Sequence, residues 1–405
     1  MEQVKSIRAA IVAVLLATLS VCHGAVKTGL DRVGQYRQIF EGKRLGIVTN
    51  HTAYDSDGKF IVEVFQRVSG GKVVALFSPE HGLWGQEQAG EKVGSRIDPV
   101  YHLPVRSLYG QTQKPTPEML RDVDILVFDI QDVGARFYTY VYTMSLAMEA
   151  AAENGKRFVV LDRPNPINGN SIEGNLLEPA QASFVGLYPI PVRYGMTMGE
   201  LAKMFNGQGW FAGGVKADLV VVPMEGWRRA MWYDQTGLRF IKPSPNMPDL
   251  ETAAIYPGLC LLEGTNVSEG RGTQMPFRQF GAPWIDSAEL TGRLNKLNLP
   301  GVRFEPTTFT PASSKHQGLE CHGVRVVVTD RERLESYYTG VRIVEEIVRM
   351  YPRNLEWKVA HFDHLCGTSA IREAIAGGRS VDELRTAWKP ALQSFLKIRN
   401  RYLIY

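Results

Sequence analysis

The sequence predicts an α/β protein, with a Rossmann-like, doubly wound parallel-sheet domain followed by a smaller α+β domain. Three observations lead to this fold class. Short apolar runs rich in β-branched residues recur in the first half of the chain, each run ends in polar residues, and helix-like amphipathic stretches separate the runs. Continuous apolar strands that alternate with helices indicate a parallel sheet covered on both faces. With 405 residues, the chain is long enough for two domains.

Four runs carry this pattern, and we expect each to contain a strand: LGIVTN at 45–50, VVALFSPEHG at 73–82, VDILVFDIQD at 123–132 and RFVVLDRPNP at 157–166. Residues 60–68 and 144–154 have the spacing of connecting helices. A fifth unit follows, with a helix at 196–206 and a strand at 218–227. These elements define a predicted catalytic domain over residues 25–241.

The Pro- and Asn-rich segment 242–250 interrupts this rhythm, and we place the domain boundary there. Downstream, the sequence predicts a helix at 286–297, strands at 302–309 and 323–330, a helix at 340–350 and further helices to the end. Residues 242–405 are therefore expected to form an auxiliary α+β domain that contributes to the ligand cleft.

Residues 1–24 have the layout of a signal peptide. Basic residues precede the apolar run 9–21, and small residues follow it. The run is short for a transmembrane span, so we expect no stable span after removal of the signal. Bulky Val21 before Cys22 disfavours lipoprotein processing. The expected location is periplasmic or secreted.

Composition and motifs exclude several functions. The 46 basic and 42 acidic residues are spread along the chain, so no basic face for nucleic acid is expected. No GxxxxGK[ST] loop, no GxGxxG between a strand and a helix and no GxSxG elbow occurs. We therefore predict no cofactor. A metal site is the rival interpretation of His51, His81, Asp129 and Asp162, but no HExxH or tight cluster supports it, and we predict none.

In open parallel sheets the ligand site lies beyond the carboxyl ends of the strands. Each predicted strand ends in groups able to do acid/base or hydrogen-bonding work, although any single one can instead cap a helix. The candidates are Asn50 and His51 after the first strand, Glu80 and His81 after the second, Asp129, Gln131 and Asp132 after the third, and Asp162, Arg163 and Asn165 after the fourth.

With the nucleotide-binding and serine-hydrolase motifs absent, catalysis by carboxylates remains as the candidate chemistry. Cleavage of a glycosidic bond uses one carboxylic acid to protonate the leaving oxygen and a second group as nucleophile, base or orienter. Glu80 in SPEHG is the candidate acid, with a capping or Arg-paired carboxylate as the alternative. Two further clusters are candidate substrate readers, because aromatic rings stack on sugars and arginines bind carboxylates. They are Arg136 and Tyr138 after the third strand, and Glu263, Asn266, Glu269 and Arg271 in a Gly-rich loop.

Several strings in one order give a resemblance that covers nearly the whole chain after residue 24: TNHTA (49–53), SPEHG (78–82), DIQDVGARFYTY (129–140), LDRPNPI (161–167), SPNMP (244–248) and YPGLCLLEGTNVSEGRGT (256–273). The chain resembles the NamZ-type exo-β-N-acetylmuramidases. The resemblance implies an exported glycosidase that releases N-acetylmuramic acid from the non-reducing end of peptidoglycan fragments. It also implies that Arg136, Arg163 or Arg271 binds the lactyl carboxylate of muramic acid.

The leading hypothesis is hydrolysis of terminal β-linked N-acetylmuramic acid during cell-wall turnover, with Glu80 as general acid. Asp129, Asp132 or Glu173 would supply the second role, or the N-acetyl group of the sugar would assist. Two alternatives stay open: a periplasmic sugar-binding protein without catalysis, and a metal-dependent cell-wall esterase or amidase.

Overall fold

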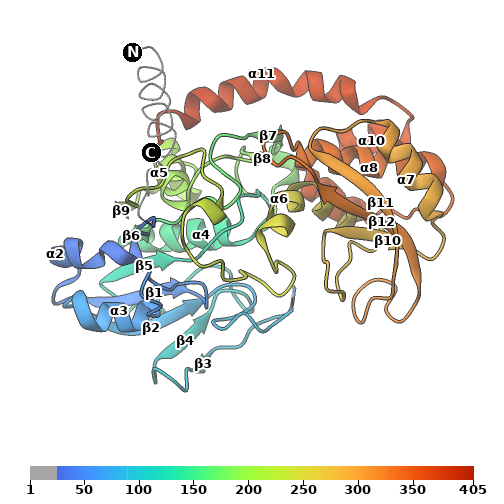
Figure 1. The fold of residues 1–405 in the computed structure, drawn as a ribbon. Helices are drawn as coiled ribbons and strands as arrows, with labels where there is room; N and C mark the ends of the chain where they lie inside the picture. The colour runs from blue at the N-terminus through green and yellow to red at the C-terminus, as the bar shows by residue number, and fades with distance from the viewer. Residues whose placement is uncertain (1–24, 89) are drawn as a thin grey trace, which may run out of the picture.

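The computed structural model describes residues 25–88 and 90–405, so the predicted signal peptide lies outside the described residues (Figure 1). The first part of the chain builds a seven-stranded sheet in the order β3-β4-β2-β1-β5-β6-β9. All neighbouring strands in it are parallel except β3 and β4. The strands are β1 (Arg44–Thr49), β2 (Lys72–Ser78), β3 (Arg96–Ile97), β4 (Pro104–Ser107), β5 (Ile125–Asp129), β6 (Arg157–Leu161) and β9 (Asp218–Val222).

Strand order and side-chain burial confirm the doubly wound fold. From the central strand β1 the sheet extends to β2 on one side and to β5 on the other. Successive side chains of a strand point to opposite faces. In β5, Val127 belongs to the hydrophobic cluster beneath α3 (Ile61–Val68), whereas Phe128 belongs to the larger cluster with α4 (Tyr140–Glu153). Both faces of the sheet are therefore covered.

Helix α5 (Met198–Gln208) begins where the sequence predicts its fifth unit. Thr197 and Glu200 form a capping box at its N-terminus, and Gly209 ends it in a left-handed conformation. Shorter helical elements precede the sheet or connect its strands: η1 (Leu30–Tyr36), α2 (Arg37–Phe40), η2 (Pro179–Gln181), η3 (Ala212–Gly214) and η4 (Tyr233–Gln235).

The second part of the chain contains a three-stranded antiparallel sheet, which confirms the smaller α+β domain. Its strand order is β10-β12-β11. The sequence pattern predicts β11 and β12 but not β10. The elements are α6 (Leu250–Leu259), η5 (Cys260–Gly264), β10 (Gln279–Ala282), α7 (Ser287–Lys296), β11 (Val302–Phe309), β12 (Cys321–Val328), α8 (Ser336–Met350), α9 (Val359–Cys366), α10 (Ala370–Ala376) and α11 (Val381–Arg399). A two-stranded sheet of β7 (Glu173–Leu176) and β8 (Pro191–Arg193) lies between the two parts.

Buried polar contacts join the two parts. Arg136 is fully buried and donates hydrogen bonds to four carbonyls, of Asn175 and Ile190 at 3.0 Å and of Leu365 and Cys366 at 3.0 and 2.7 Å. Helix α11 then runs back over the molecule toward α5 (Figure 1). At its end Arg399 donates to the carbonyl of Gly195 at 2.7 Å. The last residues of the chain thus pack against the first domain.

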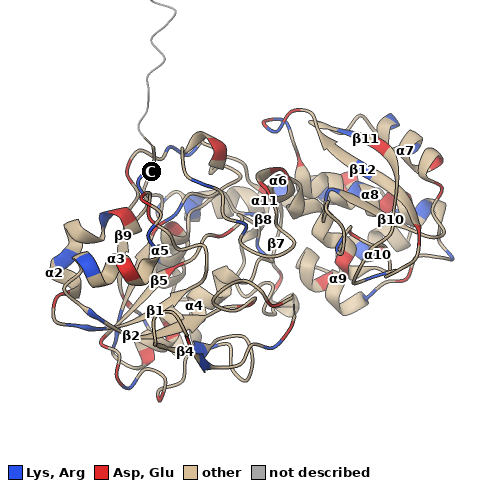
Figure 2. Ribbon diagram, turned by 60° about the horizontal axis from the view of Figure 1, so that its bottom comes forward, with Lys and Arg blue, Asp and Glu red and all other residues tan. Residues whose placement is uncertain are grey.

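The surface carries mixed charge. Figure 2 shows acidic and basic residues interspersed over both parts of the described chain. None of the helices in residues 25–88 and 90–405 combines the length and the apolar character that a membrane span requires.

Candidate active site

A cavity of about 350 Å³ lies between the two parts of the molecule. Its wall on the sheet side includes Glu80 and His81, which follow β2, and residues 137–140, which lead into α4. The other wall comes from the second part of the chain. The main side chains there are Ser244, Asn246, Met247, Tyr256, Cys260, Glu263, Arg271, Phe277 and His361. The segment around the predicted domain boundary therefore crosses this cavity.

Two hydrogen bonds hold the carboxyl group of Glu80. Its Oε1 accepts from the backbone N–H of Gly90 at 2.9 Å, and its Oε2 accepts from the hydroxyl of Thr139 at 2.7 Å. The side chain is buried and has no ion pair among the described residues. A hydroxyl can donate to an ionised carboxylate or accept from a protonated one. The site therefore accommodates both protonation states that a proton donor passes through.

Tyr109 lies beside this carboxyl group. Burial and the negative charge of Glu80 raise the pKa of the Tyr109 phenol, so the phenol keeps its proton. Its ring lies 5.9 Å from that of Phe184, which also lines the cavity.

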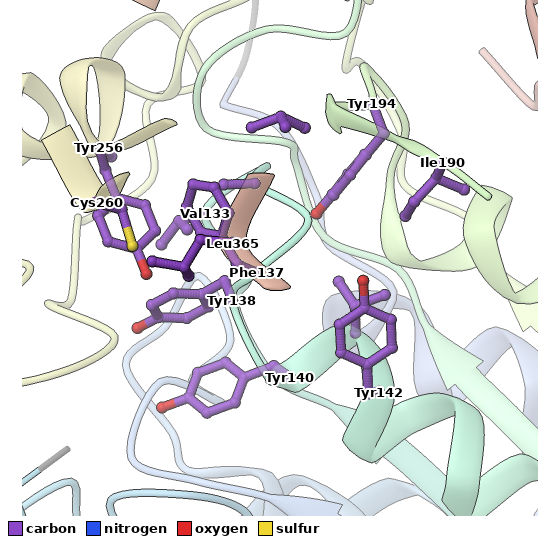
Figure 3. Packing of buried hydrophobic residues seen from close by; sticks show 14 of the residues in the cluster. Val133, Phe137, Tyr138, Tyr140, Tyr142, Ile190, Tyr194, Tyr256, Cys260 and Leu365 are labelled. Atoms are coloured by element: carbon purple, nitrogen blue, oxygen red, sulfur yellow. The ribbon is translucent and has the colours of Figure 1, made fainter. Parts of the chain in front are cut away.

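Aromatic rings form one wall of the cavity. Tyr138 packs edge-on against Tyr140 and Tyr256, with ring centroids 4.9 and 5.9 Å apart. Tyr256 packs in the same way against Phe277 at 4.8 Å. Figure 3 shows the hydroxyls of Tyr138 and Tyr140 pointing to the same side, away from Tyr142 and Tyr194. The Tyr138 hydroxyl is itself buried and has no hydrogen-bond partner among the described residues.

Arg271 is held at the edge of the cavity by two carboxylates and a ring. Its Nη2 lies 2.6 Å from Glu263 Oε1, and its Nε lies 3.2 Å from Glu269 Oε1. The guanidinium carbon lies 5.0 Å from the centre of the Phe277 ring, a cation–π distance. Arg271 therefore has little freedom to move.

The two carboxylates beside Arg271 have further partners, one lysine and one histidine. Lys315 Nζ lies 2.9 Å from Glu269, and His361 Nε2 lies 3.5 Å from Glu263. Although burial opposes the shift, Arg271 and His361 lower the pKa of Glu263 to about 2. Glu263 is consequently an ionised, paired group and is poorly suited to give up a proton.

A second hollow of about 520 Å³ adjoins the cavity. It shares Asn246, Glu263, Arg271 and His361 with the cavity, so the two form one continuous cleft. Lys358 lines this hollow and has no ion pair among the described residues, which leaves its positive charge uncompensated.

The three predicted partners of Glu80 do not line the cavity. Asp129 is fully buried and forms a two-pronged ion pair with Arg163, whose Nη2 lies 3.0 Å from Oδ2. Glu173 pairs with Arg193 at 2.7 Å and accepts from the backbone of Tyr337. Asp129 and Glu173 therefore have structural roles, because buried arginines already neutralise their charges.

Asp132, the remaining predicted partner, lies behind the aromatic wall. It accepts hydrogen bonds from the Tyr194 hydroxyl and from the backbone N–H of Gly134. Burial raises its pKa to about 6, although these hydrogen bonds oppose the shift. Its contacts fix the turn that leads to Tyr138.

Most predicted binding residues at the strand ends make structural contacts. Asn50 accepts from Thr52, Gln131 donates to the carbonyl of Pro164, and Asn165 donates to that of Met196. His51 and Arg163 line a separate hollow of about 540 Å³. Asp162 accepts from Thr197, Gly199 and Tyr405.

In the Gly-rich loop the structure separates the predicted readers. Asn266 bonds the backbone of Asn354 and Glu356 and does not line the cavity. Glu263 and Arg271 do line it, and Glu269 lines only the adjoining hollow. Arg136 is buried beneath the carbonyls that it bonds and does not line the cavity either.

Sequence reasoning missed several residues of the cavity wall. Thr139, Tyr256 and Phe277 lie in or near the strings that carry the family resemblance, so those strings could have identified them. Tyr109 follows the unpredicted strand β4, and His361 lies in α9. Nothing in their sequence neighbourhood marks the last two, because only the tertiary fold brings them to Glu80 and Glu263. Among the described residues no group of three or more His, Cys, Asp or Glu side chains is placed to hold a metal ion.

Comparisons with known proteins agree on one family. Residues 45–251 match the family described as exo-beta-N-acetylmuramidase NamZ, N-terminal, and residues 254–405 match its C-terminal counterpart. The chain is 52% identical over 382 residues to the peptidoglycan beta-N-acetylmuramidase NamZ of Bacillus subtilis (strain 168), covering 94% of this chain and 91% of that protein.

Two crystal structures of DUF1343 family proteins from Bacteroides fragilis NCTC 9343 have the same fold. One is 38% identical with a TM-score of 0.88, and the other is 34% identical with a TM-score of 0.76. Each comparison covers 94% of this chain and 99% of the other chain. Sequence and fold together place this chain in the exo-β-N-acetylmuramidase NamZ family.

Proposed function

We propose that this chain is an exo-acting glycoside hydrolase that releases β-linked N-acetylmuramic acid from the non-reducing end of peptidoglycan fragments, with Glu80 as its general acid. Family membership supports the reaction. One observation carries the residue assignment. Of the two carboxyl groups that line the cavity, Glu263 is ion-paired to Arg271, whereas Glu80 has no ion pair among the described residues.

Glu80 supplies the proton that the leaving sugar oxygen needs. As the bond between the anomeric carbon and the glycosidic oxygen breaks, negative charge develops on that oxygen, and a carboxylic acid within hydrogen-bonding reach neutralises it. Gly90 and Thr139 then stabilise the carboxylate that remains. Water from the solvent returns the proton after the product leaves.

The dimensions of the cleft support exo action. The cavity around Glu80 is at the low end of the ~300–1,000 Å³ range of ligand pockets, and its volume of about 350 Å³ favours a single sugar residue. The adjoining hollow provides space for the rest of the fragment. Tyr138, Tyr256 and Phe277 offer faces and edges on which a sugar ring packs.

Arg271 is the proposed reader of the lactyl carboxylate of muramic acid. Of the three arginines considered from the sequence, it alone lines the cavity in the described residues. Lys315 and Arg271 together offset the charges of Glu263 and Glu269, and Lys358 adds a positive charge to the same cleft. An anionic group at this point is therefore drawn toward the guanidinium.

A chromogenic nitrophenyl glycoside of N-acetylmuramic acid tests this proposal. The purified protein should release nitrophenol from it and should act far more slowly on the N-acetylglucosamine analogue, which lacks the lactyl group. Tight binding without release would instead favour the sugar-binding protein. Loss of activity in the presence of a chelator would favour the metal-dependent esterase or amidase.

Export is part of the same proposal. The signal-like composition of residues 1–24 and a substrate derived from the cell wall support it. Fractionation of cells that produce the full chain, with sequencing of the mature N-terminus, tests the location. A protein that keeps residues 1–24 in the cytoplasm would contradict it.

A further inference from the structure

His81 follows Glu80 directly and lines the same cavity. Its backbone has φ +68°, a left-handed conformation that residues with a Cβ adopt rarely, and that gathers at functional sites. The next residue, Gly82, is also left-handed, and a Cβ on it would lie 2.3 Å from a carboxylate oxygen of Glu87. Two successive left-handed residues thus form the turn that places the imidazole at the cavity.

One hydrogen bond fixes the protonation pattern of that imidazole. His81 Nδ1 lies 2.7 Å from the backbone carbonyl oxygen of Glu87. A carbonyl oxygen can only accept, so Nδ1 carries the hydrogen, and in the neutral ring Nε2 presents an unprotonated lone pair. No partner for Nε2 is found among the described residues. Because Nδ1 is engaged by the chain, Nε2 is the nitrogen that a ligand in the cavity can meet.

Hydrolysis requires a group that can accept a proton inside the cavity. The water that bonds to the anomeric carbon must lose a proton, and the proton donor Glu80 cannot accept it while it is still protonated. Glu263 is tied to Arg271, while Asp129, Asp132 and Glu173 do not line the cavity. His361 also lines the cavity, but it is paired with Glu263. Among the described residues of the wall, His81 is thus the unpaired base beside the proposed acid.

We infer that His81 is a second catalytic residue, which takes the proton of the attacking water at Nε2 while Glu80 protonates the leaving oxygen. This inference rests on the proposed function. The water oxygen bonds to the anomeric carbon, and the glycosidic bond breaks with its electron pair going to the leaving oxygen. One proton passes from the water to His81 Nε2, and another passes from Glu80 to the leaving oxygen. Exchange with solvent returns His81 to the neutral form and Glu80 to the acid.

The substitution His81→Asn isolates this role. The amide nitrogen of asparagine occupies about the place of imidazole Nδ1, so the bond to the Glu87 carbonyl is retained, and asparagine tolerates a left-handed backbone better than most residues. Only the base at Nε2 is removed. His102→Asn is the matched control, because His102 is also left-handed, with φ +54°, but is exposed and does not line the cavity.

Kinetics with the nitrophenyl muramide, with and without added azide, provide the test. His81→Asn should lower kcat by about 10²- to 10⁴-fold with KM nearly unchanged, while His102→Asn matches the wild type. Azide needs no base to attack, so it should restore turnover of His81→Asn and yield the glycosyl azide. In that step azide bonds to the anomeric carbon as nitrophenolate departs.

The outcomes separate this inference from the proposed function. If the wild type releases no nitrophenol, the proposed function itself fails. If the wild type is active and His81→Asn keeps a near-native kcat, His81 is not the base. A loss that azide does not restore, in a variant whose thermal unfolding matches the wild type, would likewise overturn the inference.

Discussion

The hydroxyl of Thr139 lies 2.7 Å from Oε2 of Glu80, which ties the carboxyl group after β2 to the N-terminus of α4. Thr139 is the N-cap residue of α4, yet its side chain makes no capping hydrogen bond. The hydroxyl is therefore directed at Glu80 instead of its own helix. Two elements separated by about 60 residues in sequence thus set the position of one carboxyl group.

Thr139→Val should lower kcat, because it removes the hydroxyl that donates to Glu80. A hydrogen bond to a charged group contributes about 1.5–3 kcal/mol, which corresponds to roughly 10- to 100-fold in rate if it acts in the transition state. Unfolding should show at most the cost of one buried acceptor without its donor, about 1–3 kcal/mol, because no helix cap is lost. Thr139→Ser, which keeps the hydroxyl, is the control. Equal rates for both variants would show that the contact has no role in turnover.

Arg271→Lys should reduce the preference for muramic over glucosamine glycosides. Lysine retains the charge but cannot bind a carboxylate with two parallel hydrogen bonds or stack as a plane on Phe277. We expect the ratio of the two kcat/KM values to fall about tenfold or more. Arg278→Lys serves as the control, since Arg278 pairs with Asp249 and Glu251 and does not line the cavity. An unchanged ratio would place the carboxylate reader elsewhere.

Arg136→Met should destabilise the protein without changing the affinity of folded enzyme for substrate. The substitution removes the arginine donor from the buried carbonyl oxygens of Asn175 and Leu365, whereas those of Ile190 and Cys366 also accept from Leu177 and Asn175. Each buried acceptor left unsatisfied costs about 1–3 kcal/mol, so urea unfolding should show a loss of about 2 kcal/mol or more. Native stability combined with a raised KM would restore Arg136 as a substrate reader.

The free energy of unfolding should fall between pH 5 and pH 8. Burial raises the pKa of Asp162 to about 7, although Gly199 and Thr197 oppose the shift. Since the folded protein holds this proton more tightly than the unfolded chain, the stabilisation is present below the unfolded pKa near ~4. It is lost as the pH rises through about 7.

Asp162→Asn should flatten this pH dependence. Asp124→Asn is the control, because hydrogen bonds from Arg44 lower the pKa of Asp124 to about 2, and it gains no proton in this range. Urea unfolding at pH 5 and pH 8 measures the difference for each protein. The same slope in wild type and Asp162→Asn would show that another group dominates.

The sequence predicted the sheet well because its strands are buried on both faces. The apolar runs of β1, β2, β5, β6 and β9 carry this information locally. The short strands β3 and β4 have only 2 and 4 residues and were missed. Helix α8 begins at Ser336, four residues before the predicted start, because Gly340 lies within the helix where it packs closely on Gly258 of α6.

The site was less predictable than the fold. Glu80 and Asp129 look alike in sequence, since both follow apolar strands. They differ in the structure because Arg163, 34 residues beyond Asp129, neutralises that carboxylate, whereas no arginine of residues 25–88 and 90–405 forms an ion pair with Glu80. A pattern of strand ends identifies which groups gather at one edge of the sheet. It does not identify which of them are paired there.

The central claim is that Glu80 protonates the leaving oxygen, and leaving-group dependence in Glu80→Gln measures it most directly. The variant keeps the shape of the side chain but has no proton to give. With a disaccharide whose leaving sugar needs a proton, kcat should fall about 10²- to 10⁴-fold. With a dinitrophenyl glycoside, which departs without one, the loss should be much smaller. Near-native rates on the disaccharide, or equal losses on both substrates, would contradict the assignment.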